Sequence, residues 1–444
     1  MIRLPAREYA HRRQALMAQM TPGSAALLPA APVQLRNRDV EQVYRQDSDF
    51  QYLTGFPEPE ALLLLIPGRA QGEYVLFCRE RDPERELWDG KRAGQDGAVR
   101  DYGADQAYAI DDLDEVLPGL VENRTRLYYP LGISESFDRQ VSGWLASLRQ
   151  RARQGINPPV EFVALDHLLH EMRLIKSEAE IALMQAAADV SAKAHVRAMQ
   201  TCRAGLNEYH LEAELEYAFR LGGAKLPAYG SIVASGHNAC ILHYRENDQP
   251  LKDGDLVLID AGCELDCYAS DITRTFPVSG RFSPEQRAIY ELVLAAQTAA
   301  FAAIAPGRHW NEAHEAALRT LTAGLIELGL LHGELETLLE GEAYKPFYMH
   351  RTGHWLGMDV HDVGHYKVEG QWRPLQPGMV LTVEPGLYIA ADNLQVEARW
   401  RGIGVRIEDD VLVTAEGCRV LTGGVPKTVA EIEALMAAAG GEAA

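Results

Sequence analysis

A capping box at residues 177–180 divides this sequence into two parts with different patterns. Ser177 and Glu180 are three residues apart, so each side chain can satisfy a backbone amide at the start of a helix. The run EAEIALMQAAADVSAKAHVRAMQ that follows has helical periodicity and predicts a long helix. We therefore expect a domain boundary just before this cap, near residue 175.

The first 174 residues alternate between two kinds of pattern. AALLLLIP and EYVLFC are short apolar runs bounded by Gly or Pro, which predicts buried strands. DRQVSGWLASLRQRARQ has the spacing of an amphipathic helix. This alternation favours an α/β domain over residues 1–174.

Residues 175–444 follow a different order. Helical patterns extend to about residue 223, strands and turns to 280, helices again to about 340, and strands and turns from 345 to 422. The elements alternate without regular strand–helix–strand repeats. The second domain is therefore predicted to be α+β.

Composition limits the partners and the compartment. The chain of 444 residues has a formal net charge of −20 and no basic cluster, which disfavours nucleic acid as a partner. The N-terminus lacks the apolar core of a signal peptide, and no apolar run is long enough to span a membrane. Six scattered cysteines without a CxxC pair are typical of reduced thiols. We expect a cytoplasmic protein with no membrane partner.

Acidic residues stand in strand-like stretches where a plain strand would not carry them. Asp260 ends LVLID, Asp271 follows in SDITRTF, and Glu384 and Glu408 lie in LTVEPG and VRIEDD. A turn around residues 264–266 could bring the two aspartates together. Buried carboxylates need a partner, and two Asp, two Glu and one histidine are the ligands expected for a pair of divalent cations. So many oxygen donors favour Mn²⁺ over a thiolate-type zinc site.

The stretch HRTGHWLGMDVHD, residues 350–362, adds three histidines, and here a resemblance becomes plain. It is similar to the signature shared by aminopeptidase P and prolidase. DGDLVLIDAGCELDCYASDITRTFPVSG, VEPGLYI and GVRIEDDVLVT resemble the other metal-bearing blocks of this family. YRQDSDFQYLTGF and LWDGKRAG in the first half look more like aminopeptidase P than like a short prolidase. The resemblance covers nearly the whole chain.

The resemblance implies a role for ten residues. Carried over by motif, Asp271 and Glu408 would bridge two divalent ions, of Mn²⁺ or else Zn²⁺ or Co²⁺. The complete ligand set would be Asp260, Asp271, His354, Glu384 and Glu408. The catalytic residues would be Glu384, His243 and His361, and the substrate-binding residues His350, Arg406 and Tyr388.

Other residues near this stretch receive simpler interpretations. Gly353 and Gly357 flank His354, and we expect them to let the backbone approach the ions closely. The remaining histidines without a matching context are interpreted as ordinary: His309, His314, His332 and His365.

The implied fold is an α/β N-terminal domain followed by an α+β catalytic domain of the "pita-bread" type. The implied activity is release of the first residue of a peptide whose second residue is proline, by a hydroxide held between two metal ions. Family members with this N-terminal domain form homo-oligomers, so we expect a dimer or tetramer. Trp88 could then reach a neighbouring subunit's cleft.

Two alternatives remain open at this point. The chain could be a prolidase, which would cleave only Xaa-Pro dipeptides. It could also be a peptide-binding module that kept the fold and lost catalysis, although such relatives typically lose metal ligands. Creatinase-like hydrolysis without metal is disfavoured by the complete ligand set, and methionine aminopeptidase lacks such an N-terminal domain.

Overall fold

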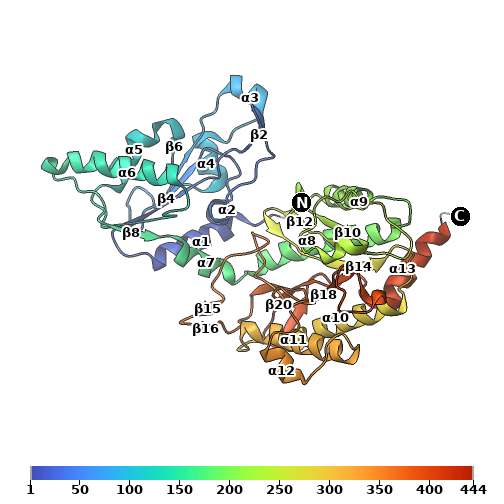
Figure 1. Cartoon of the computed structure of the whole chain (residues 1–444). Helices are drawn as coiled ribbons and strands as arrows, with labels where there is room; N and C mark the ends of the chain where they lie inside the picture. Colours follow the sequence, from blue (N-terminus) through green and yellow to red (C-terminus); the bar gives the residue numbers. More distant parts are fainter. Residues whose placement is uncertain (1–2, 443–444) are drawn as a thin grey trace. The chain divides into compact units, whose positions relative to one another are not determined.

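The computed structural model describes residues 3–442, which form two compact units. One unit spans Leu4–Met172, and the other comprises Arg3 and the residues from Arg173 onward. The division falls close to the boundary expected near residue 175. Figure 1 shows the elements of each unit.

The N-terminal unit is built on a six-stranded mixed sheet with the order β6-β5-β4-β1-β7-β8. Strand β1 pairs antiparallel with β4 and parallel with β7. The runs expected as buried strands become β4 and β5, whose residues are all buried. The strands are β1 (Ser24–Pro29), β4 (Leu62–Leu65), β5 (Tyr74–Cys78), β6 (Gln106–Ala109), β7 (Arg126–Tyr129) and β8 (Glu161–Ala164).

Helices pack around this sheet. The expected amphipathic helix is α6 (Glu135–Gln150), which buries Trp144 and Leu148 in a core shared with β1, β4, β5 and β7. A short hairpin of β2 (Leu35–Asn37) and β3 (Val40–Glu41) lies outside the sheet. The other helices are α1 (Ala6–Gln19), α2 (Ser48–Thr54), α3 (Pro83–Asp89), α4 (Gly94–Tyr102), α5 (Leu113–Val121) and α7 (Asp166–Leu174), which ends in the second unit.

The second unit contains two helix pairs. Helix α8 starts with the predicted capping box: Ser177 caps the helix and the Glu180 side chain accepts from the Ser177 amide at 2.8 Å. It packs on α9, and α10 packs on α11. In Figure 1 the two pairs lie on opposite sides of the strands. The helices are α8 (Glu178–Thr201), α9 (Glu208–Leu221), α10 (Pro284–Ala302), α11 (Trp310–Glu327), α12 (Leu335–Glu340) and α13 (Val429–Glu442).

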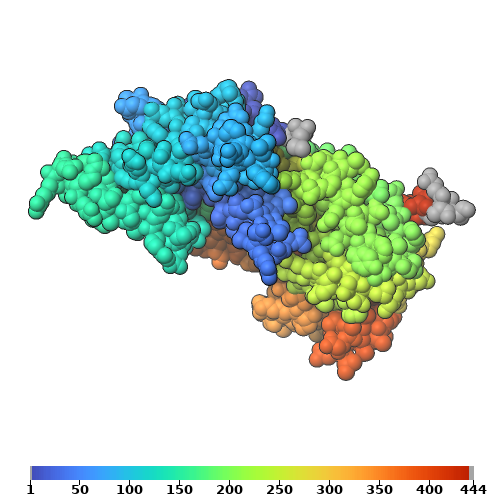
Figure 2. Space-filling model, turned by 90° about the horizontal axis from the view of Figure 1, so that it is seen from above, coloured from blue at the N-terminus to red at the C-terminus, as the bar shows by residue number. Residues whose placement is uncertain are grey.

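The strands of this unit form small antiparallel sheets that hold the middle of the domain. Figure 2 shows the face on which α9 and the strands after it, light green to yellow-green, reach the surface. The first half contributes β9 (Leu226–Pro227), β10 (Ile232–Ser235), β11 (Leu256–Asp260), β12 (Cys263–Leu265), β13 (Tyr268–Ala269) and β14 (Thr273–Pro277). The second half contributes β15 (Lys367–Val368), β16 (Gln371–Trp372), β17 (Val380–Val383), β18 (Gly386–Ile389), β19 (Ile403–Arg406), β20 (Asp409–Val413) and β21 (Cys418–Val420).

Candidate metal centre and substrate cavity

Strand register gathers the acidic residues at neighbouring strand ends. Asp260 is the last residue of β11 and pairs with Thr273 at the start of β14. Val383 at the end of β17 pairs with Asp409 at the start of β20. Glu384 and Glu408 are the next residues outward from that pair, so the hairpin-like register brings them together. The turn expected around residues 264–266 lies slightly later, at Asp266 and Cys267, which have positive φ and connect the paired residues Leu265 and Tyr268.

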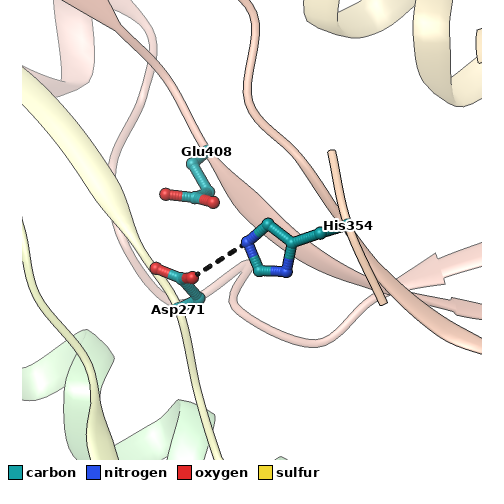
Figure 3. A group of neighbouring side chains, drawn as sticks. All are labelled: Asp271, His354 and Glu408. Carbon is teal, nitrogen blue, oxygen red and sulfur yellow. Dashed lines mark ion pairs between the residues drawn. The ribbon is translucent and has the colours of Figure 1, made fainter. Parts of the chain in front are cut away.

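Asp271, His354 and Glu408 form a cluster of metal-type donors, with one ligand atom from each within 4.8 Å of the others (Figure 3). His354 Nε2 lies 3.4 Å from Asp271 Oδ2 and 3.8 Å from Glu384 Oε1. The other ring nitrogen, Nδ1, lies 2.9 Å from the Trp355 carbonyl oxygen and donates to it. In the neutral ring, this hydrogen bond selects the tautomer in which Nε2 has a lone pair available to an ion.

Asp260 is held beside this cluster by two side chains. Arg406 Nη2 lies 2.7 Å from Asp260 Oδ2. The Tyr229 hydroxyl lies 2.7 Å from Asp260 Oδ1 and also contacts Asp271 Oδ1. Tyr229 was missed by sequence reasoning, because AYGSI carries no motif that distinguishes it from a core tyrosine.

The electrostatics of the cluster suit a cation. Burial and the neighbouring carboxylates raise the pKa of Glu408 well above its ordinary value and that of Glu384 to about 7. Burial also raises the pKa of Asp260. Asp271 departs from this pattern: burial would raise its pKa, but the hydrogen bond and charge of His354 lower it. Without a cation, crowded carboxylates retain protons because their negative charges repel one another. A bound divalent cation would offset this repulsion and keep them ionised. The donor set therefore fits metal ions.

A cavity of about 640 Å³ opens beside the cluster. It is lined by all five carboxylate and histidine donors of the implied ligand set and by His243, His350, His361 and Arg406. Within the described residues, the His243 ring makes no hydrogen bond with the protein. The His361 ring packs edge to face on His354, with centroids 4.4 Å apart. Burial, together with His354, lowers the pKa of His361, so its ring is neutral near pH 7.

His350 belongs to a chain of hydrogen bonds. Its Nδ1 lies 2.7 Å from the Arg351 carbonyl oxygen, and its Nε2 lies 2.8 Å from the Tyr388 hydroxyl. The Tyr388 oxygen in turn accepts from Arg406 Nη1 at 3.1 Å. Burial and the Arg406 charge lower the pKa of His350 to about 3. The ring is therefore neutral, donating through Nδ1 and accepting at Nε2.

Tyr388 was expected to line the substrate cleft, and the structure places it elsewhere. It is 2% exposed and is not among the residues that line the cavity. Its hydroxyl lies behind His350 and Arg406 because β18 directs the ring into the core. Its contacts are with the residues expected to bind substrate, not with the cavity itself.

The loop that carries His243 is anchored by Glu208, which sequence reasoning also missed. Glu208 is fully buried at the start of α9. Its carboxylate accepts from the Ser235 amide at 2.7 Å, from the Tyr244 hydroxyl at 2.8 Å and from the Gln249 amide at 3.0 Å. A glutamate after Asn207 reads as an ordinary first-turn residue, so no local pattern reveals this role.

The loop that carries His361 is anchored by its neighbour Asp362. Asp362 accepts from Arg173 Nη2 at 2.6 Å and from Lys176 Nζ at 2.8 Å, and all three side chains are buried. A Cβ at Gly357 would lie 2.1 Å from Asp362 Oδ2. The glycine thus makes room for the ion pair, and not only for an approach to metal ions.

The structure also gives Gly353 and His314 packing roles that the sequence did not indicate. A Cβ at Gly353 would lie 2.0 Å from the Thr382 carbonyl oxygen, so this glycine permits close packing against β17. His314, expected to be ordinary, has its Nδ1 2.8 Å from Thr352 Oγ1, between His350 and His354 in sequence. Burial lowers the pKa of His314 to about 4, so it supports this segment as a neutral ring.

Comparison with known proteins assigns the family. The model of metallopeptidase family M24 matches residues 182–415, and that of the aminopeptidase P N-terminal domain matches residues 9–128. The Xaa-Pro aminopeptidase of Escherichia coli is 48% identical over 433 residues, which cover 97% of this chain and 98% of the relative.

Solved structures agree with this assignment. A Pseudomonas aeruginosa aminopeptidase matches with a TM-score of 0.99 and 72% identity, covering 99% of this chain and 100% of that chain. Zinc-substituted E. coli aminopeptidase P in complex with product matches with a TM-score of 0.96 and 48% identity, covering 98% and 99%. The predicted α/β N-terminal domain and pita-bread catalytic domain are thereby confirmed. The chain belongs to metallopeptidase family M24, among the aminopeptidases P.

Proposed function

We propose that this chain is a Xaa-Pro aminopeptidase, a metal-dependent hydrolase that releases the N-terminal residue from peptides with proline at the second position. One observation carries the proposal: a single cavity collects His354, three further histidines and four carboxylates, of which Asp271 and Glu408 are buried and Asp260 and Glu384 half-buried. The curated relative matched over 97% of the chain carries the same activity in its name.

Two divalent cations would be held by Asp260, Asp271, His354, Glu384 and Glu408. Four of these five donors are carboxylates, which favours Mn²⁺, with Zn²⁺ or Co²⁺ as substitutes. Arg406 and Tyr229 hold the Asp260 carboxylate, and the hydrogen bond from His354 Nδ1 to Trp355 directs Nε2 toward the cluster. When bound, the cations supply a water of lowered pKa, and therefore a nucleophile near neutral pH.

Proton transfer, stabilisation of the developing negative charge and substrate binding are carried out by side chains of the protein. The Glu384 carboxylate accepts the proton of the attacking water and returns it to the proline nitrogen as the peptide bond breaks. His243 and His361 donate N–H hydrogen bonds to the carbonyl oxygen as negative charge develops on it. The neutral His350 ring and Arg406 bind the proline side, and Tyr388 orients both of them from behind.

Hydrolysis of two peptides tests this proposal against prolidase. Metal-free protein is supplied with Mn²⁺, Zn²⁺ or no metal and assayed with Arg-Pro-Pro and Gly-Pro. Metal-dependent release of arginine from the tripeptide, with a low rate on the dipeptide, is expected of a Xaa-Pro aminopeptidase. Rapid dipeptide cleavage with an inert tripeptide would instead assign a prolidase. No turnover of either, with metals bound, would favour a binding module.

The two domains are divided before the capping box of α8. We place the N-terminal domain at residues 1–174 and the catalytic domain at 175–444.

A homodimer or homotetramer is supported by apolar side chains that the N-terminal unit exposes, since Leu87 and Trp88 are 85% and 87% exposed. Sedimentation equilibrium of wild-type protein and of Trp88→Ala tests it, and a monomeric wild type would contradict it.

The compartment is proposed from cysteine chemistry. All six cysteines are free thiols, as in a reducing cytoplasm. Separately, no helix among residues 3–442 combines the length and apolarity that a membrane crossing requires. Cell fractionation would test the cytoplasmic assignment, and recovery in an oxidising compartment would contradict it.

A further inference from the structure

Two arginines line the cavity and take no part in the proposed chemistry. They are Arg245, two residues after His243, and Arg351, next to His350. Both are exposed. Among the described residues, neither guanidinium lies within ion-pair distance of a carboxylate. Both contrast with Arg406, which also lines the cavity but is paired with Asp260.

Arg351 is the better oriented of the two. Its Nη1 donates to Asn311 Oδ1 at 3.0 Å, and its guanidinium lies 5.0 Å from the centroid of the Trp372 ring. These contacts use one of five N–H donors and one face of the group, so an edge remains for an anion. A guanidinium held in place loses less conformational freedom on binding than a free one.

The position of Arg351 points to the part of the substrate that follows proline. Its carbonyl oxygen accepts from His350, the residue assigned above to the proline side. The acidic side chains that line the cavity, Asp260, Asp271, Glu384 and Glu408, are all members of the proposed metal-ligand set. With cations bound, the charge of these carboxylates is offset, and Arg245 and Arg351 remain as cations of the cavity without a carboxylate partner, to which a substrate carboxylate would be attracted.

We propose that Arg351 is a specificity residue that binds a carboxylate carried by the third residue of the substrate. This inference rests on the proposed function. The carboxylate is the C-terminal group of a tripeptide or an acidic side chain at the third position. Planar bidentate pairing suits both sources. Arg245 contributes positive potential at the cavity without the same fixed contacts.

The test compares kcat/KM for Arg-Pro-Pro with that for Arg-Pro-Pro-amide, on metal-loaded wild type, Arg351→Gln, Arg351→Lys and Arg245→Gln. Wild type is expected to favour the acid about tenfold, as for a hydrogen bond to a charged group. The preference should appear mainly in KM and should decrease with salt. It should approach 1 in Arg351→Gln, be intermediate in Arg351→Lys and persist in Arg245→Gln.

A second pair of substrates, Arg-Pro-Glu-amide and Arg-Pro-Gln-amide, separates the two carboxylate sources. A preference for the glutamate peptide that Arg351→Gln removes assigns the side chain, and a preference confined to the first pair assigns the C-terminal group. An unchanged acid preference in Arg351→Gln, or its loss in Arg245→Gln alone, would overturn the assignment. Failure of metal-loaded wild type to cleave any of these peptides would instead contradict the proposed function.

Discussion

Glu384→Gln is expected to lower kcat for Arg-Pro-Pro by about 10²- to 10⁴-fold, the range for loss of a positioned general base. Glutamine keeps the size of the side chain and one oxygen that could reach an ion. It cannot accept the proton of the attacking water. Steady-state kinetics, combined with metal analysis of the same sample, measures the effect.

Metal content decides how that loss is interpreted. A variant that retains the wild-type number of ions and loses turnover supports the role as base. A metal-replete variant with near-normal kcat would contradict it. Glu416→Gln, an exposed glutamate of the same unit, is the matched control and should leave kcat and metal content unchanged.

Asp362→Asn is expected to lower the free energy of unfolding by about 3–5 kcal/mol, because it leaves buried Lys176 without its carboxylate partner and removes one of the two carboxylates that pair with buried Arg173. Asparagine has nearly the same shape, so the loss reports the charge. Activity should fall as well, since His361 precedes this residue. Urea unfolding measures the change. Glu291→Gln, in an exposed ion pair with Arg287, is the control and should cost less than about 1 kcal/mol.

The pH dependence of the Asp362 effect has a defined sign. Burial would raise the pKa of Asp362, but Lys176 and Arg173 outweigh burial and lower it. The stabilisation by ionised Asp362 is thus fully present above its pKa in the unfolded chain, about 3.9. It is lost as pH falls through its lower pKa in the folded protein. The difference between wild type and Asp362→Asn should be constant from pH 8 to 5 and shrink below about pH 4. A difference that grows on acidification would contradict this account.

The fold could be predicted in outline because its signals are local. The capping box at Ser177 and Glu180 marks the start of α8 correctly. Apolar runs predict β4 and β5 because both strands are buried on both faces. The order of β6, β5, β4, β1, β7 and β8 could not be predicted, since pairing between distant strands leaves no local pattern.

The residues of the candidate site also fall into those that local motifs predict and those that only long-range contacts reveal. The residues expected to carry the chemistry stand in motifs, and all of them except Tyr388 line one cavity. Tyr388 was expected in the cleft because motif proximity cannot tell which side of a strand faces the substrate. Tyr229, Glu208 and Asp362 act through contacts with residues 27 to 189 positions away, which sequence spacing does not reveal.

Anomalous diffraction from crystals loaded with Mn²⁺ tests the central claim most directly. The account predicts two manganese peaks, about 3.5–4 Å apart, within the cluster of Asp260, Asp271, His354, Glu384 and Glu408. In Figure 3 three of these side chains already point toward a common centre. A single peak, or peaks away from these five residues, would contradict the assignment of a two-metal centre.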